Sequence, residues 1–401
     1  MRKLVCLYLL LAFSLCAAAQ KKELSAARDN LKSGKNLEQS ERDLRKLLEK
    51  PANRQNEKIW LTLFDIVKKQ YDQGNEKLYL KQGFDTARIF VLTGNMFDVL
   101  ERFDSIDAMP DAKGVVKPRH RRKHATFLND YRPNLFNGGR FFVNKKKYKE
   151  AYRFFDMYVD CISQPLFEQY QYENDARSLY EAAYWASFCA YQQKDSKATL
   201  HHAVLALKDS THYRSMLQIL AETYLMERDT TRYLETLHEG FKKFPLDLYF
   251  FRNLVVNHAE QQEWKDIIRL SDMGIVADST VIDFLFAKCT ALLNTSHYDE
   301  SIVMGNRIMN LNDSIAETYY NVGLAWFNKA VLLDKQLKKT SAQKKQMAEY
   351  YRKALPYMEH YRKRDPEKIQ RWSSPLYTIY LNLNMGKEFE EIDKLIRKQG
   401  K

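Results

Sequence analysis

The feature that most constrains this 401-residue chain is a pattern of large and small side chains that recurs with a period of about 34 residues between Ser210 and Asp313. Each block opens with a large residue, at Leu217, Phe251 and Leu285. A glycine follows in the second half, at Gly240, Gly274 and Gly305 in turn. One degenerate copy would say little, but copies in a fixed phase predict stacked helix-turn-helix repeats.

Composition agrees with a packed helical chain. Only 13 glycines and 9 prolines are present, which disfavours a loop-rich β protein, and 45% of residues are hydrophobic, which excludes a disordered chain. The formal charge is +13, and it falls to +11 if Arg2 and Lys3 are removed with a leader. This excess predicts an acidic protein partner or an anionic membrane surface. We do not expect nucleic acid as a partner of an exported chain.

Residues 1–19 have the features of a secretory signal peptide. A basic start at residues 1–3 precedes the apolar run Leu4–Leu15 and the small residues Ala17–Ala19, so the mature chain is expected to begin at Gln20. Lipidation at Cys16 is the less favoured alternative, because the preceding leucine is bulky. The apolar run is also too short to span a bilayer. We therefore expect export to the periplasm, with association with the outer membrane left open.

Three cysteines remain after the leader, at Cys161, Cys189 and Cys289. They are widely spaced, and two of them fall on repeat positions that face the packed interior. We expect buried, free thiols instead of a disulfide framework.

Beyond the leader, the sequence predicts a divergent helical region at residues 20–131 and a repeat array at 132–401, with insertions near 162–177 and 332–350. In the divergent region, Gln73-Gly74-Asn75 and Thr93-Gly94-Asn95 are interpreted as breaks between helices. A further helix is expected to end near Arg132-Pro133. The lysine-rich second insertion is expected to lengthen both helices of its hairpin.

The array resembles tetratricopeptide-repeat (TPR) proteins over residues 132–401. The first clear copy contains these positions of the motif in order: Leu135, Gly138, Gly139, Phe142, Tyr148, Ala151, Phe155 and Tyr158. The tail Tyr350–Tyr357, with Asp365-Pro366-Glu367 after it, is similar to the ends of secreted repeat proteins of Gram-negative bacteria. The resemblance implies an all-α, right-handed α-solenoid that serves as a binding scaffold, and it implies nothing about catalysis.

The most distinctive charged stretch is the basic run at residues 117–124. Its cations form a predicted docking patch for an anionic surface or an acidic protein: Lys117, Arg119, Arg121, Arg122 and Lys123. The alternative is a solvated helix start. His120 and His124 have the spacing of metal ligands on a helix, but the neighbouring cations would repel a metal ion.

No catalytic motif or cofactor site is predicted. His202 falls on a core-facing position and His201 points elsewhere, so two adjacent histidines are not expected to share a metal on one helix face. Carboxylates that could act as an acid and a base lie in different hairpins, at Asp65, Asp98, Glu222 and Asp283. We therefore predict no metal, no cofactor and no small-molecule substrate.

First-helix positions that the repeat does not use for packing are predicted to line a concave binding groove. They are Asn137, Arg140, Asn144, Tyr184, Ser187, Tyr191, Glu222, Arg252, Asn253, Asn321 and Asn328. Asparagine side chains both donate and accept hydrogen bonds, so they could hold the backbone of an extended peptide. They could equally satisfy neighbouring helices within the protein, and the sequence does not separate these two interpretations.

These observations favour a non-catalytic periplasmic scaffold that binds a protein or peptide through its concave surface. One alternative is an accessory subunit of an outer-membrane assembly or secretion machine, which an exposed apolar patch on the convex face would favour. The other is an envelope enzyme acting on cell-wall polymer, which an aromatic groove with two facing carboxylates would favour.

Overall fold

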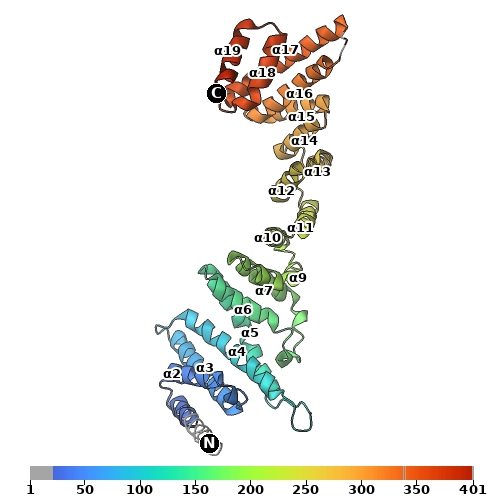
Figure 1. The fold of residues 1–401 in the computed structure, drawn as a ribbon. Coiled ribbons are helices and arrows are strands. Elements are labelled where there is room, and N and C mark those ends of the chain that lie inside the picture. Colours follow the sequence, from blue (N-terminus) through green and yellow to red (C-terminus); the bar gives the residue numbers. More distant parts are fainter. Residues whose placement is uncertain (1–20, 337, 339, 400–401) are drawn as a thin grey trace, which may run out of the picture. The chain divides into compact units, whose positions relative to one another are not determined.

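The computed structural model describes residues 21–336, 338 and 340–399, so the predicted signal peptide and Cys16 lie outside the described residues. The described chain consists of helices joined by turns and a few longer loops (Figure 1). It divides into a first compact unit that ends at Arg228 and a second that begins at Asp229. Within each unit successive helices pack on one another, which confirms the predicted all-α solenoid of TPR-like helix-turn-helix repeats.

The first unit starts with a helix at residues 21–33 and continues to Met226. Its further elements are α2 (Leu37–Glu49), η1 (Pro51–Asn53), α3 (Glu57–Tyr79), α4 (Thr86–Asp107), α5 (Arg121–Asn144), α6 (Tyr148–Asp160), η2 (Pro165–Phe167), η3 (Tyr172–Asn174), α7 (Ala176–Gln192), α8 (Ser196–His201), α9 (Ala203–Ala206) and α10 (Tyr213–Met226). The η elements are single 3-10 turns.

Three predicted helix boundaries in the first unit are wrong. Gly74 lies inside α3 and Gly94 inside α4, and α5 runs through Pro133. The two glycines give room to rings from other elements, because a Cβ on Gly74 would lie 2.6 Å from the Phe84 ring and one on Gly94 would lie 3.3 Å from the Phe154 ring. A glycine that permits close packing has the same local signature as one that ends a helix.

The insertion at residues 162–177 covers α5. Its Tyr172 donates a hydrogen bond to Asn129 Oδ1 at 2.8 Å. The buried Arg132 guanidinium lies between the rings of Tyr158 and Tyr172, with its carbon 3.8 Å from each centroid. A buried cation held in this way is stabilised by the two aromatic faces. The insertion is therefore part of the core of the first unit.

The second unit runs from α11 to α19, and each helix packs against the next. Its helices are α11 (Thr230–Lys243), α12 (Leu248–Glu260), α13 (Trp264–Ala277), α14 (Ile282–Asn294), α15 (Tyr298–Leu311), α16 (Ala316–Asp334), α17 (Ser341–Arg364), α18 (Ile369–Asn382) and α19 (Gly386–Gln399). The second insertion lengthens α16 to 19 residues and α17 to 24, as predicted. Thr340 and Gln343 form a capping box that starts α17.

The turn between the two helices of a hairpin repeats as regularly as the helices do. Residues at four successive turns have positive φ angles near 60°, and they recur with the period of the array: Lys194, Arg228, Gln262 and Ser296. A single left-handed residue ends the first helix and redirects the chain into the second. The turn geometry thus supports the repeat register predicted from the sequence.

Two further expectations concern the cysteines and the possibility of a membrane span. Cys161, Cys189 and Cys289 are buried and free, as predicted. Among the described residues, no helix is both long enough and apolar enough to span a bilayer.

Candidate functional site

The positions predicted to line a concave groove fall into three groups. Four are exposed, namely Asn137, Arg140, Asn144 and Arg252. Four are half-buried, namely Tyr191, Glu222, Asn253 and Asn328. The remaining three, Tyr184, Ser187 and Asn321, are buried, so they do not belong to a binding surface. The predicted positions from Asn137 to Glu222 lie in the first unit, and those from Arg252 to Asn328 lie in the second.

Two of the three buried members, Tyr184 and Asn321, and the half-buried Asn253 have internal partners, whereas the buried Ser187 hydroxyl has no hydrogen-bond partner among the described residues. The Tyr184 ring stacks on His212, with centroids 4.1 Å apart. Asn321 donates a hydrogen bond to Thr290 Oγ1 at 2.9 Å, and Asn253 donates to the carbonyl of Tyr249 at 2.8 Å. For these two asparagines the structure supports the interpretation in which they satisfy neighbouring groups. Arg252, though exposed, pairs with Asp283, with 2.6 Å between Nε and Oδ1.

The basic run is partly neutralised. Arg121 binds the buried Asp104 through two hydrogen bonds of 2.9 and 2.8 Å, and Arg119 pairs with Glu57. Lys117, Arg122 and Lys123 form no ion pair with any described residue. The docking patch therefore contains three available cations instead of five.

The histidines of this run are structural. His120 Nε2 lies 2.9 Å from Glu57 Oε1, and its ring stacks on His124 at a centroid distance of 5.5 Å. Burial lowers the pKa of His124 to about 4, with His120 adding to the shift. His124 is thus a neutral member of an aromatic cluster with Phe64 and Phe103.

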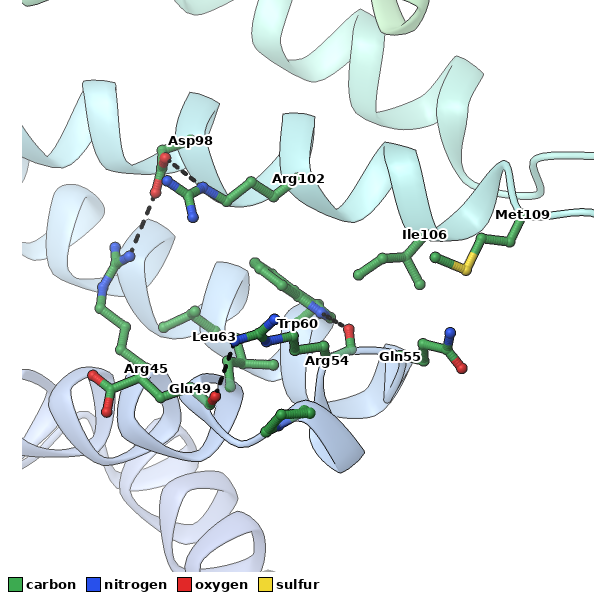
Figure 2. A pocket seen from close by; sticks show the side chains of 12 residues that line it. Arg45, Glu49, Arg54, Gln55, Trp60, Leu63, Asp98, Arg102, Ile106 and Met109 are labelled. Atoms are coloured by element: carbon green, nitrogen blue, oxygen red, sulfur yellow. Dashed lines mark hydrogen bonds and ion pairs between the residues drawn. The ribbon is translucent and has the colours of Figure 1, made fainter.

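A cavity lies elsewhere in the first unit, between α2, α3 and α4, and we call it the α2–α4 groove. Its volume is about 810 Å³ (Figure 2). The lining residues are Arg45, Leu48, Glu49, Pro51, Arg54, Gln55, Trp60, Leu63, Asp98, Arg102, Ile106 and Met109. Sequence reasoning missed it, because these residues come from three α-helices and the connections beside them in the divergent region and share no period.

The wall of the groove is a rigid turn. Pro51 starts a 3-10 turn directly after α2, and the buried Asn53 closes it by donating to the carbonyl of Leu47 at 3.0 Å. Trp60 on α3 donates its indole N–H to the carbonyl of Arg54 at 2.8 Å, and Asn56 caps α3. These bonds fix the turn against α3, so the groove is already formed without a ligand.

One end of the groove is ionic and the other is apolar, as Figure 2 shows. At the ionic end Asp98 binds Arg102, 2.8 Å from its Nε, and lies 3.5 Å from Arg45 Nη1. The Arg102 side chain remains 68% exposed, so one face of its guanidinium is open to solvent. At the other end lie Ile106 and Met109, and Met109 is 47% exposed.

Arg54 is the least satisfied cation of the groove. Its guanidinium donates only to the carbonyl of Glu49, at 3.3 Å, and it has no carboxylate partner in the part of the chain that the structure describes. Of the three lining arginines, Arg45 pairs with Glu41 and Asp98, and Arg102 pairs with Asp98, so Arg54 alone lacks a carboxylate partner among the described residues. Guanidinium groups bind carboxylates through paired hydrogen bonds, so the groove suits an acidic group beside an apolar side chain.

The carboxylates near the groove do not form an acid–base pair. Asp98 is held by two arginines. Glu101, one turn along α4, has a pKa raised to about 8 by burial first and then by Asp98 and Asp160. Asp98 stabilises the ionic end of the groove, and Glu101 is protonated at neutral pH.

A second cavity of about 530 Å³ adjoins this groove, because Gln55, Ile106 and Met109 line both. It continues the apolar end toward Val115 and the unpaired Lys117. An extended segment bound in the α2–α4 groove could therefore reach the first cation of the basic run. This juxtaposition links the predicted docking patch to the groove.

An apolar surface lies in the second unit on α11 and α13, the second helices of two successive hairpins. Met273 is 46% exposed, Val276 88% and Leu246, just after α11, 54%. Met273 and Val276 line a shallow cavity of about 710 Å³ with Pro245 and Ile268. We call this surface the α11–α13 patch.

The expectation for the adjacent histidines is corrected by the structure. The α-helix is interrupted at His202, between α8 and α9, so His201 and His202 do not follow one helical period. His202 is buried and His201 exposed, as predicted, yet both rings approach the same aspartates, Asp156 and Asp160.

Comparisons with solved structures find similarity to TPR proteins. The C-terminal part of a TPR repeat-containing protein from Cytophaga hutchinsonii superposes with a TM-score of 0.42 at 11% identity, covering 65% of this chain and 93% of that one. The TPR2AB domain of yeast Sti1, solved as a complex with pHSP90, has a TM-score of 0.27 at 15% identity, covering 79% and 98%. No protein-family model and no curated protein matches the sequence. At these values no partner is transferred to this chain.

Proposed function

We propose that this chain is a non-catalytic interaction scaffold of the periplasm, whose first unit binds an extended acidic segment of a protein partner in the α2–α4 groove. The observation that carries the proposal is the pairing, within one preformed groove, of the unpaired Arg54 and the open Arg102 with the apolar residues Ile106 and Met109. Three of the predicted first-helix positions are buried, which moves the main binding surface to this groove.

The occupant follows from the lining. A carboxylate of the partner would take the free donors of Arg54 or Arg102, and a neighbouring apolar side chain would cover Met109. The adjoining cavity is lined by Glu57, Asp107 and Asp111 as well as Lys117, so the acidic contact is confined to the α2–α4 groove. TPR-like arrays commonly present such surfaces to partner segments. Binding is therefore expected to weaken as salt concentration rises.

The test is a crosslinked pull-down from intact envelopes with the full chain tagged at its C-terminus. Arg54→Glu with Arg102→Glu should reduce recovery of the partner about tenfold or more, because both variants repel its carboxylates. The matched control, Arg153→Glu with Lys149→Glu, makes the same change in net charge at two exposed positions outside the groove. Equal recovery by both double variants would refute the groove as the binding site.

Export is part of the same proposal and rests on residues 1–19 of the sequence. Mass spectrometry of the purified envelope protein should find Gln20 as the first residue. An acylated Cys16 at the N-terminus would establish the lipoprotein alternative, and an intact Met1 would contradict export by cleavage.

A second candidate function, an accessory subunit of an outer-membrane machine, is favoured by the α11–α13 patch. Charged residues at Met273 and Val276 should then release a partner that survives high salt, because such an interface is apolar. Met273→Lys with Val276→Lys is the variant to use in the same pull-down. Loss of the partner only in this variant would favour the subunit function over the groove.

A further inference from the structure

Four side chains with metal-binding atoms converge where α6 meets the junction of α8 and α9. Asp156, Asp160, His201 and His202 each place one ligand atom within 4.8 Å of all the others. We call them the His–Asp cluster. His202 Nε2 lies 2.8 Å from Asp156 Oδ1 and 3.9 Å from Asp160 Oδ1, and His201 Nε2 lies 3.9 Å from the same Asp160 oxygen.

The local backbone explains the convergence. Asp156 and Asp160 are one helical turn apart on α6, so their carboxylates share one helix face. His202 has φ −105° and ψ 10°, which ends α8 and starts α9. This break brings two adjacent imidazoles to the same side, with ring centroids 4.3 Å apart and planes tilted by 53°. An uninterrupted helix would have sent them about 100° apart.

The spacing suits a small tetrahedral ion. With metal–ligand bonds of about 2.0–2.1 Å, neighbouring ligand atoms of a tetrahedral site lie about 3.3 Å apart. The three separations given above, from 2.8 to 3.9 Å, lie on both sides of that value. Small side-chain movements would therefore bring all four ligand atoms to bonding distance from one ion. Two imidazole nitrogens and two carboxylate oxygens form a donor set typical of Zn²⁺.

The charges of the cluster also call for a cation. No lysine or arginine pairs with Asp156 or Asp160 among the described residues.

We propose that the His–Asp cluster is a binding site for one Zn²⁺ ion, or a chemically similar transition-metal ion, that clamps α6 to the α8–α9 junction. Two successive hairpins would share the ion, through two aspartates of α6 and two histidines at the α8–α9 junction, so its role is structural. The site is separate from the α2–α4 groove and does not depend on the proposed function.

A second group in the chain provides an internal comparison. His258, Glu263 and Asp266 also bring ligand atoms within 4.8 Å of one another. That group has only three members, and Arg269 pairs with Asp266 at 2.9 Å. A permanent cation already offsets part of its charge, so we expect it to bind metal weakly. It serves as the control for nonspecific binding.

The test is a metal titration of the full chain purified without a histidine tag. Co²⁺ should bind at one ion per chain with the visible absorption of a four-coordinate site, and Zn²⁺ should displace it and raise the midpoint of thermal unfolding. His201→Ala with Asp160→Asn removes two ligands that are 56% and 39% exposed, so the fold should persist, which circular dichroism verifies. This variant should weaken binding by about 100-fold or more.

The control variant is Glu263→Gln with Asp266→Asn, which should leave the Co²⁺ spectrum and affinity unchanged. Three results would overturn the proposal. These are no saturable binding by the wild-type chain, equal binding by the His201→Ala and Asp160→Asn double variant, and loss of binding in the control variant.

Discussion

The two units use glycine and aromatic residues differently. In the second unit Gly240 and Gly274 hold the same position of successive repeats, and each faces a phenylalanine of the next helix, Phe250 and Phe284 respectively. Both rings are fully buried. The same glycine–phenylalanine contact therefore recurs with the period of the sequence. The helices from α11 to α15 contain 13 or 14 residues each and stack in register.

The first unit has no such repeated contact at its start. Its α3, α4 and α5 contain 23, 22 and 24 residues, and their glycines face rings from irregular positions. The turn at 51–56 joins α2 to α3 and the loop at 108–120 joins α4 to α5, and residues of both connections line the α2–α4 groove. Regular repetition thus produces a packed array in the second unit, whereas the irregular helices and connections of the first unit produce the α2–α4 groove.

Of the substitutions considered, Gly274→Ala in the second unit is expected to change the free energy of unfolding most. The new Cβ would lie 2.6 Å from atoms of the Phe284 ring, which is fully buried and cannot move aside. We expect the free energy of unfolding to fall by about 2–4 kcal/mol. Chemical denaturation measures it. Gly386→Ala is the control, since nothing lies within 4 Å of its Cβ position. Equal stability of the two variants would contradict the repeated-contact explanation.

The next largest change in the free energy of unfolding is expected from Glu101→Gln in the first unit. The folded chain keeps a proton on Glu101 up to about pH 8, whereas the unfolded chain releases it near 4.5, so this group makes stability fall as pH rises between those values. Removing the carboxylate should add about 1–3 kcal/mol at pH 9 and little at pH 4.5. Denaturation at both pH values measures this. The exposed Glu150→Gln should change neither, and a pH-independent effect of Glu101→Gln would contradict the assignment.

Gly74→Ala sharpens the comparison between the units, because its Cβ would meet the Phe84 ring at the same 2.6 Å. Phe84 is only half-buried and lies in the connection between α3 and α4, so it can move. Alanine also favours the helix by about 1 kcal/mol over glycine. We expect a net loss of about 1 kcal/mol or less by denaturation. A loss as large as that of Gly274→Ala would show that the first unit is packed as rigidly as the second.

The smallest effect is expected at a hairpin turn. Gln262 is exposed and has φ +58°, a conformation that costs a side chain free energy and glycine none. Gln262→Gly should therefore stabilise the chain by about 0.5–1 kcal/mol in the same assay. Gln261→Gly, one residue earlier with φ −89°, should not stabilise it. Stabilisation by both would point to a cause other than the turn.

Much of the second unit follows from its sequence. The spacing of Phe251, Gly274 and Leu285 predicts helices and turns that the structure contains, since a repeat places each side chain against its neighbour's equivalent. The first third does not follow in this way. Gly74 and Gly94 predict turns when only the local sequence is considered, but rings from distant residues occupy the space beside them.

The candidate sites were less predictable than the fold. Register distinguishes first-helix positions, but it did not show that Ser187 and Asn321 are covered by neighbouring helices. For His201 and His202 the assumed helical period failed at one residue, where the backbone leaves the helix. The α2–α4 groove has no local signature, because Arg54, Arg102 and Met109 come together only after three elements have packed.

The sequence by itself determined the helical class, the repeat register and the buried thiols, because periodic apolar residues can be buried in few other ways. Tertiary structure alone decided which cations are free, which asparagines are internal and where the groove and the His–Asp cluster lie. These depend on distances between side chains far apart in the sequence, such as the 46 residues between Asp156 and His202. Such distances are set by how whole helices pack, and no local pattern encodes them.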